Sequence, residues 1–274
     1  MSNSAEIIRS KDNGFLKHIR QLQQGGSKGQ RARAESKQAV LDGIHLLQAW
    51  LGDPRLNCIV LTQDALLNAE IEQLKNAHVK QCPNTQLQFV EPSLWSTISE
   101  LENSPPIMGL IELEDGFNQL PTIKTDAIIL DAVQDAGNVG TILRTALACH
   151  FTQVICTVGT AHIWSPKVLR AAMGAHRHLH FYEGQTPEDI KDKVQIPLLA
   201  TISSAQQSLY TLEKMLQKPL VWVFGNEGQG VSKELLASAT QVRIPQNSQI
   251  ESLNVAVSAA VCLYETQRVR GNLG

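Results

Sequence analysis

Three segments of the sequence place glycines and polar side chains directly after apolar runs, where ligand sites often form. They lie at residues 131–144, 225–230 and 252–260. Glycines let a backbone approach a ligand closely, and an arginine beside free backbone N–H groups binds a phosphate well. Of the polar side chains there, Arg144 could bind such an anion, and Glu227 would face solvent or a ligand. The three segments are therefore candidates for one ligand site.

Each segment also fits an ordinary structural role. Asn138 can cap a helix that begins near it, with Arg144 on the helix surface, and residues 225–230 can form a tight turn. Ser252 is typical of a cap for the alanine-rich helix that follows. The glycine spacing, G-x-x-G-x-G, differs from the dinucleotide pattern G-x-G-x-x-G, and the sequence holds no G-x-x-x-x-G-K-[ST] phosphate loop. A nicotinamide-dependent dehydrogenase is therefore not indicated.

The elements that must position these residues alternate between apolar, strand-like runs and helical segments. The predicted strands cover residues 127–130, 154–157, 198–200, 220–224 and 242–244. Continuous apolar strands separated by helices are typical of a parallel sheet covered on both faces, and ligands bind beyond the carboxyl ends of such strands. We therefore predict an α/β domain over residues 126–274, with the candidate residues at one edge of its sheet.

A smaller α/β domain is predicted over residues 1–112, followed by a polar linker at 113–125. The hydrophobic spacing predicts a short helix around 15–22, a flexible basic loop at 25–29 and a helix over 40–51. Its other predicted elements are strands at 58–61, 87–90 and 107–113 and helices at 64–77 and after Pro92. We see no catalytic constellation in this domain.

The charge distribution is uneven although the whole chain has a net charge of only −2. Residues 1–37 carry eight basic and three acidic side chains, a net charge of +5. A basic segment on an acidic body often contacts a polyanion, although a merely solvated surface fits the charge equally well. We expect Lys28, Arg31 and Arg33 to contact a polyanion such as RNA, and the scattered aromatic residues exclude base stacking as the main mode of nucleic-acid recognition.

The remaining composition places the protein in a reducing compartment. Its five cysteines form no C-x-x-C pair, no apolar run approaches the 18 residues of a membrane span, and residues 1–14 lack the apolar core of a signal peptide. We therefore expect a cytoplasmic protein. His176, His178 and His180 alternate, so on a strand they would share one face and could hold a metal, but packing is the favoured interpretation and we predict no metal.

The three segments together resemble the signature motifs of the SpoU family of RNA ribose methyltransferases, within the SPOUT class. The N-x-G-x-x-x-R motif matches 138–144, G-x-E-G-x-G matches 225–230, and I-P…S-L-N-V matches 244–245 with 252–255. Residues 165–168 and 172–175 also resemble the stretch between the first two motifs. This chain departs mildly, with Ala136 where many members have proline and Asn226 where a small residue is common.

The resemblance implies a fold and a cofactor that periodicity alone would not predict. It implies a deep trefoil knot in the C-terminal domain and S-adenosylmethionine bound near Gly225, Ile244 and Leu253, with Thr201 close by. Family members are homodimers whose active site draws on both subunits. Residues 14–112 are similar, less specifically, to the L30e-type RNA-binding domain that many members carry.

The implied reaction is transfer of a methyl group from the sulfonium of the cofactor to a ribose 2′-hydroxyl. The family assigns Arg144 to the hydroxyl, with Asn138, Glu227, Ser252 and Asn254 shaping the site. Because an arginine is rarely neutral, we expect Arg144 to orient the hydroxyl and stabilise charge; a role as general base requires a nearby RNA phosphate to accept its proton.

The sequence leaves the RNA substrate open. Structured RNA recognised by shape is expected, with ribosomal RNA favoured over transfer RNA. The alternative function is a non-catalytic RNA-binding or ribosome-assembly factor that retains the fold. The presence of Arg144, Asn138 and Glu227 argues against it, because a site without catalysis has no use for them.

Overall fold

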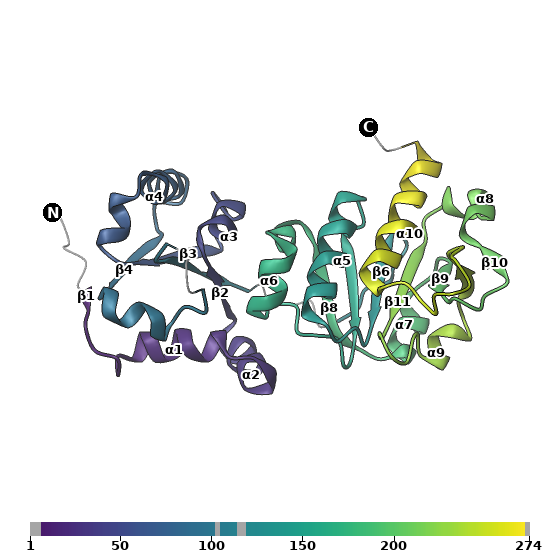
Figure 1. Cartoon of the computed structure of the whole chain (residues 1–274), viewed down its shortest axis with the longest axis horizontal. Helices are drawn as coiled ribbons and strands as arrows, with labels where there is room; N and C mark the ends of the chain where they lie inside the picture. Colours follow the sequence, from purple (N-terminus) through teal and green to yellow (C-terminus); the bar gives the residue numbers. More distant parts are fainter. Residues whose placement is uncertain (1–6, 102–104, 114–118, 272–274) are drawn as a thin grey trace. The chain divides into compact units, whose positions relative to one another are not determined.

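Figure 1 shows the chain as a computed structural model, which describes residues 7–101, 105–113 and 119–271. Residues 1–115 with 162–174 form one compact unit, here called the N-terminal unit, and residues 116–161 with 175–274 form the C-terminal unit. The sequence had placed 162–174 with the C-terminal domain. The boundaries at 112 and 126 stay a prediction, and residues 114–118 of the expected linker lie outside the described residues.

The N-terminal unit is built on a mixed sheet with the strand order β1-β4-β3-β5-β2. Its strands are β1 (Ile7–Ile8), β2 (Gln38–Asp42), β3 (Leu56–Leu61), β4 (Gln86–Val90) and β5 (Ile107–Glu112). β5 runs antiparallel to both β2 and β3, whereas β4 pairs in parallel with β1 and β3. The predicted strands at 58–61, 87–90 and 107–113 are thus confirmed within a residue or two.

Two apolar cores cover the two faces of this sheet. One contains residues of α1 (Gly14–Gln23) and of the 3₁₀ helix η2 (Pro92–Thr97). The other contains residues of α3 (Ile44–Ala49), η1 (Asp64–Leu67) and α4 (Ala69–Gln81). Leu169 of α6 (Pro166–Ala172) is fully buried in this second core, which is why residues 162–174 group with the N-terminal unit.

Two sequence predictions in this unit are wrong. The expected loop at 25–29 belongs to helix α2 (Gly26–Ser36), and the expected helix over 40–51 is β2 followed by α3. Gly43, at φ 98°, separates these two elements. The apolar residues that suggested one helix are therefore divided between a strand and a helix, and their helical spacing is accidental. α2 packs close to the end of α1 because Gly29 has no side chain: a Cβ there would lie 1.7 Å from the carbonyl oxygen of Gln24.

The C-terminal unit contains a seven-stranded sheet in which every pairing is parallel, with the order β10-β12-β9-β11-β6-β7-β8. The strands are β6 (Ala127–Asp131), β7 (Gln153–Thr157), β8 (His180–Gln185), β9 (Leu198–Thr201), β10 (Gln207–Ser208), β11 (Val221–Gly225) and β12 (Thr240–Arg243). All five predicted strands of this domain are present. The predicted α/β class with a parallel sheet is therefore confirmed.

Helices cover both faces of this sheet (Figure 1). Helices α7 (Pro187–Lys193) and α9 (Lys233–Leu236) contribute Ile190 and Leu235 to one core. On the other side, α5 (Ala136–Ala148) packs against α10 (Val255–Arg270), and Trp222 of β11 donates a hydrogen bond to Thr266 of α10 at 3.0 Å. η3 (Ala175–His178), η4 (Leu209–Thr211) and the short α8 (Glu213–Leu216) complete the unit. The trefoil knot stays a prediction.

No helix in the described ranges combines the length and apolar character that crossing a bilayer requires.

Candidate active site

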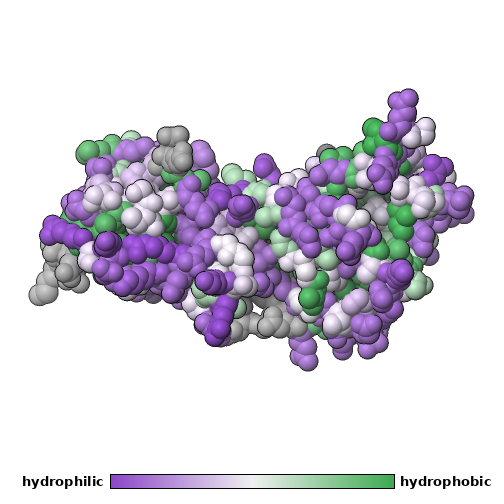
Figure 2. All heavy atoms as spheres, turned by 60° about the horizontal axis from the view of Figure 1, so that its bottom comes forward, coloured by the Kyte–Doolittle hydropathy of each residue, from purple (hydrophilic) through white to green (hydrophobic). Residues whose placement is uncertain are grey.

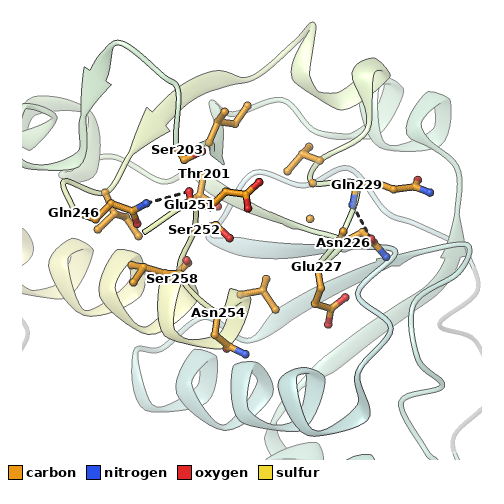
Figure 3. Close-up of a pocket in the computed structure, with 18 of the residues that line it drawn as sticks. Thr201, Ser203, Asn226, Glu227, Gln229, Gln246, Glu251, Ser252, Asn254 and Ser258 are labelled. Atoms are coloured by element: carbon orange, nitrogen blue, oxygen red, sulfur yellow. Dashed lines mark hydrogen bonds between the residues drawn. The ribbon is translucent and has the colours of Figure 1, made fainter. Parts of the chain in front are cut away.

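The carboxyl ends of β6, β11, β9 and β12 meet at one edge of the C-terminal sheet, because these four strands are parallel neighbours. The loops that follow β9, β11 and β12 enclose a pocket of about 500 Å³ (Figure 3). That volume lies in the range of small-molecule sites, roughly 300–1,000 Å³. The position is where the sequence predicts a ligand.

Six of the predicted site residues line this pocket: Gly225, Glu227, Ile244, Ser252, Leu253 and Asn254. Figure 3 shows Glu227 on one wall and Ser252 and Asn254 at the start of α10 on another. Thr201, which the resemblance placed near the cofactor, lines the pocket at the end of β9. The structure therefore brings the second and third motifs to a common cavity.

Backbone groups at two of these positions are available to a ligand. Within the ranges that the structure describes, the N–H and C=O groups of Ile244 and Leu253 have no hydrogen-bond partner. Both residues are partly exposed in the wall of the pocket. Unpaired backbone donors and acceptors in a cavity are suited to the edge of a heterocyclic base, which offers the complementary groups.

Gly225 is required by a close approach of the backbone. Its loop returns on itself, with Asn226 and Gly230 exchanging two backbone hydrogen bonds of 3.0 and 2.9 Å. A Cβ on Gly225 would lie 2.3 Å from the carbonyl carbon of Gly230 and from the nitrogen of Val231. No other residue fits there without moving the pocket wall.

A chain of side-chain hydrogen bonds joins all three motifs beside the pocket. Asn138 donates from Nδ2 to Oε1 of Glu227 at 3.0 Å and accepts at Oδ1 from Nδ2 of Asn254, also at 3.0 Å. Glu227 also accepts from the backbone N–H groups of Gln134 and Asp135, at 3.2 Å each. The chain fixes the orientation of the Asn138 amide, because one end must donate and the other must accept.

These contacts keep Glu227 ionised. Partial burial alone would raise the pKa of its carboxyl, but the hydrogen bonds from Asn138 and from the backbone outweigh burial, so the pKa lies below its ordinary value. At neutral pH the side chain is therefore a carboxylate that accepts hydrogen bonds. It holds no proton to donate.

The helix caps differ from those suggested by the sequence. Asp135, and not Asn138, caps α5, and its carboxylate accepts from the backbone N–H of Asn138 at 2.7 Å. Asn254, and not Ser252, caps α10, accepting from the N–H groups of Ala256 and Val257 at 2.8 and 3.3 Å. Asn138 and Ser252 are thereby left to face other groups, so their structural interpretation as caps is wrong.

Arg144 lies apart from this cluster. It is exposed on α5, does not line the pocket, and makes no hydrogen bond or ion pair within the described part of the chain. Ser252 lines the pocket but likewise has no hydrogen-bond partner among the described residues. The two side chains are thus available to other molecules.

The basic residues of α2 do not share one environment. Lys28 and Arg31 are exposed and line a groove of about 520 Å³ between α1 and α2, where Arg31 pairs with Glu35 at 2.6 Å. Arg33 is only 1% exposed and donates to the backbone carbonyls of Leu22 and Gln24. The prediction that Arg33 contacts RNA is therefore wrong, because its guanidinium is used inside the protein.

The three alternating histidines do not lie on one strand. His176 and His178 belong to η3, and His180 begins β8. His176 is buried and packs against Phe181, with 5.2 Å between ring centroids. Among the described residues, no group of three or more potential ligands could hold a metal ion.

Several polar residues of the pocket carry no sequence signal of their own. Ser203, Gln246, Glu251 and Ser258 line it alongside the motif residues (Figure 3). Their only shared property in the sequence is that they follow β9 or β12 or begin the last helix. The fold brings these residues from separate loops to one pocket, and local sequence patterns do not predict such an arrangement.

Comparison with known proteins gives consistent results. The model of the SpoU rRNA Methylase family matches residues 126–264. The chain is 32% identical over 273 residues to an "Uncharacterized tRNA/rRNA methyltransferase" of Synechocystis, covering 98% of this chain and 96% of that one. It is 27% identical to the 23S rRNA (guanosine(2553)-2′-O)-methyltransferase RlmP of Bacillus subtilis, covering 85% and 90% of the two chains.

A solved structure agrees over nearly the whole length. The AdoMet-bound rRNA methyltransferase of Sinorhizobium meliloti superposes with a TM-score of 0.79 at 26% identity, covering 96% of this chain and 98% of that one. The family model covers the three motifs and the strands that position them. With the fold, the motif geometry and these matches in agreement, the chain belongs to the SpoU rRNA methylase family.

Proposed function

We propose that this protein is an enzyme that transfers a methyl group from S-adenosylmethionine to a ribose 2′-hydroxyl of RNA. The observation that carries the proposal is the hydrogen-bonded chain of Glu227, Asn138 and Asn254, which joins the three family motifs beside one pocket. The substrate is ribosomal RNA, in preference to transfer RNA, since RlmP of Bacillus subtilis is named for 23S rRNA.

The pocket suits S-adenosylmethionine in its groups as well as its volume. Gly225, Ile244 and Leu253 are the cofactor-binding residues; the first lets the backbone pass close by, and the other two offer unpaired backbone donors and acceptors to the adenine edge. When bound, the cofactor supplies a methyl group activated by a positively charged sulfur. Glu227 and Glu251 give the cavity wall negative charge, which favours a cationic ligand.

The main task of the protein in this reaction is to align the ribose hydroxyl with the methyl group. The ribose oxygen would have to be held in line with the activated methyl group, and the hydroxyl proton would pass to water or to an RNA phosphate. Glu227 is an ionised carboxylate whose oxygens already accept from three groups, so it holds the site in shape. Asn138 and Asn254 do the same from α5 and α10, and Ser252 can offer its hydroxyl to the substrate.

Arg144 is the residue assigned to the reacting hydroxyl. A guanidinium can orient the hydroxyl and stabilise the charge that develops on its oxygen as the methyl group transfers. Acting as a base is chemically demanding, because a guanidinium stays protonated in proteins, and requires an RNA phosphate to accept the proton. Orientation and charge stabilisation are therefore its proposed roles.

The position of Arg144 favours a homodimer. Arg144 is exposed and outside the pocket of its own chain, so a second copy can bring it to a pocket. α10 also exposes Val257 and Tyr264, which are 49% and 46% exposed and seven residues apart, on one face of the helix. Apolar surface of this kind is typical of an interface. In the proposed dimer, Arg144 of one protomer serves the pocket of its partner.

Mixed dimers test this arrangement. An Arg144→Ala subunit keeps its pocket, and a Gly225→Ala subunit, whose pocket wall is blocked, keeps its arginine. Each variant alone should be inactive. Coexpression should restore methylation, because one pocket then meets one arginine across the interface. Inactive mixed dimers would contradict the shared site and place Arg144 beside its own pocket.

Residues 1–112 of the N-terminal unit are the proposed L30e-like RNA-binding domain. Its contact surface is the groove between α1 and α2, where Lys28 and Arg31 are exposed. In Figure 2, where this side of the molecule comes forward, the surface over these helices is mostly hydrophilic. Lysine and arginine on such a surface bind phosphates of folded RNA.

A cytoplasmic location is part of the same proposal. The cysteines of this chain are free thiols, and four of the five are buried. Burial raises the pKa of Cys149 to about 11 and that of Cys58 to about 12, so neither is a reactive thiolate. Such thiols are compatible with a reducing compartment, where the RNA substrate is also found.

The direct test compares ribosomal and transfer RNA from cells with and without this gene. Mass spectrometry of the digested RNA quantifies each 2′-O-methyl nucleoside. Loss of one such nucleoside from ribosomal RNA is the expected result. If no nucleoside changes and the purified protein does not bind S-adenosylmethionine, the protein is a non-catalytic RNA-binding factor and the proposal is wrong.

A further inference from the structure

Asn226, the first residue after β11, uses every polar atom of its side chain. Its Oδ1 accepts from the backbone N–H groups of Gly228 and Gln229, at 2.9 Å each, and its Nδ2 donates to the carbonyl of Ala132 at 2.8 Å. Figure 3 shows the contact with Gln229 at the wall of the pocket.

The bond to Ala132 is one half of a reciprocal link between two loops. The loop after β6 receives a hydrogen bond from Asn226 and returns two, from Gln134 and Asp135 to the carboxylate of Glu227. Because Glu227 directly follows Asn226, two consecutive residues make all three of these hydrogen bonds to the loop after β6. The far end of the glycine loop is held too, since the N–H of Ser232 donates to Asp131 at 2.7 Å.

Ala132 needs such a restraint. It has a φ of 54°, a left-handed conformation that a non-glycine residue rarely adopts. Its N–H donates to the hydroxyl of Thr157 at 2.9 Å, and its C=O accepts from Asn226. Side chains thus hold both backbone groups of a strained residue in the loop that precedes the first motif, which is the usual way such strain persists.

We propose that Asn226 is a positioning residue with two separable tasks in the reaction, an inference that rests on the proposed function. Its Oδ1 shapes the Gly228–Gln229 wall of the cofactor pocket. Its Nδ2 fixes the peptide of Ala132, and with it the two N–H groups that hold Glu227 toward Asn138. The first task governs cofactor affinity, and the second governs turnover.

Two substitutions separate these tasks. Asn226→Asp keeps an acceptor for Gly228 and Gln229 but loses the donor to Ala132. It should bind S-adenosylmethionine within about threefold of the wild type, while kcat at saturating cofactor falls by about tenfold, the effect of one hydrogen bond. Asn226→Ala loses both functions, so its dissociation constant should rise by about tenfold in addition. Calorimetry gives the binding constant, and methyl incorporation into RNA gives kcat.

Asn68→Ala is the matched control. Asn68 makes the same kind of bond in the N-terminal unit, accepting at Oδ1 from the N–H of Glu70 at 2.9 Å at the start of α4. The Asn68→Ala substitution should lower the melting temperature without changing cofactor affinity or kcat. If both Asn226 variants behave in this way, the inference is wrong. If Asn226→Asp loses as much cofactor affinity as Asn226→Ala, the two tasks are not separable and the inference is also overturned.

Measurements on the wild-type protein distinguish a failure of this inference from a failure of the proposed function. A wild type that neither binds S-adenosylmethionine nor methylates RNA overturns the proposed function and the inference with it. An active wild type whose Asn226 variants match the control overturns the inference alone.

Discussion

Two of the arginines that the sequence analysis singled out, Arg33 and Arg144, lie in opposite environments, and the contrast separates structural from functional charge in this protein. Arg33 on α2 is 1% exposed and bonded to two backbone carbonyls, so it stabilises the packing of α2 against the end of α1. Arg144 on α5 is exposed and makes no bond within the described residues. Charge counting treats the two alike. Only Arg144 belongs to a motif whose other members meet in space.

The largest expected effect is the loss of turnover in Arg144→Ala. Because Arg144 does not line the cofactor pocket, the variant should bind S-adenosylmethionine with wild-type affinity while kcat falls by about 100-fold or more, as for loss of a group that stabilises developing charge. Arg144→Lys retains the charge but not the planar fork and should remain severely impaired. Turnover near the wild-type rate in the alanine variant would contradict the assignment.

Substitution of Arg33 should instead reduce stability. Arg33→Met leaves the carbonyls of Leu22 and Gln24 without a donor, which should cost about 1–3 kcal/mol of unfolding free energy in chemical denaturation. The matched control is Arg31→Met, two positions earlier on the exposed face of the same helix, which should unfold close to the wild-type midpoint. Equal destabilisation by the two variants would remove the contrast between them.

In RNA binding, substitution of the exposed Arg31 should have an effect and substitution of the buried Arg33 should have none. Neutralising Lys28 or Arg31 should weaken binding and lower the slope of log affinity against log salt by about one for each RNA phosphate that the side chain neutralises in the wild type. Arg33→Met, where it remains folded, should leave that slope unchanged, since its guanidinium is buried. Filter binding over a series of salt concentrations measures the slope. Unchanged slopes for Lys28 and Arg31 would move the RNA surface away from the groove between α1 and α2.

The smallest expected effect is the pH dependence that Glu227 confers. Its folded pKa is lowered, so the stability that its ionised form contributes is fully present above its unfolded pKa of about 4.3 and is lost as the pH falls through the folded value. The difference in melting temperature between the wild type and Glu227→Gln should therefore shrink below about pH 4. A difference that stays constant between about pH 7 and pH 3 would show that the fold does not shift the pKa of Glu227, and it would contradict this prediction.

How far the sequence predicts the molecule depends on whether a feature is local. Strands β6, β7, β9 and β11 were predictable because each holds a continuous apolar run, and the site because glycines and polar residues follow such runs at the spacing of the family motifs. Helix α2 was not predictable, because Gly25 and Gly26 favour a loop while a buried Arg33 and the contact at Gly29 hold the helix.

The roles of the asparagines show the same limit. Asn138 looks like a helix cap in the sequence, yet Asp135 makes that cap and leaves the Asn138 amide to join Glu227 and Asn254. Which of two neighbouring polar residues caps a helix depends on the residue at which the helix begins, and the sequence does not fix that residue. Asn226, likewise, acquires its contact with Ala132 only when the loops after β6 and β11 lie side by side.

The most direct test of the proposed chemistry uses the purified protein, S-adenosylmethionine carrying a labelled methyl group, and ribosomal RNA. A methyl group on a ribose 2′-oxygen blocks alkaline cleavage at the next phosphate, so digestion in alkali should leave the label in resistant dinucleotides. The wild type should produce labelled dinucleotides, and Arg144→Ala should not. Label recovered only in single nucleotides would mean methylation of a base, and it would contradict ribose 2′-O-methylation by this site.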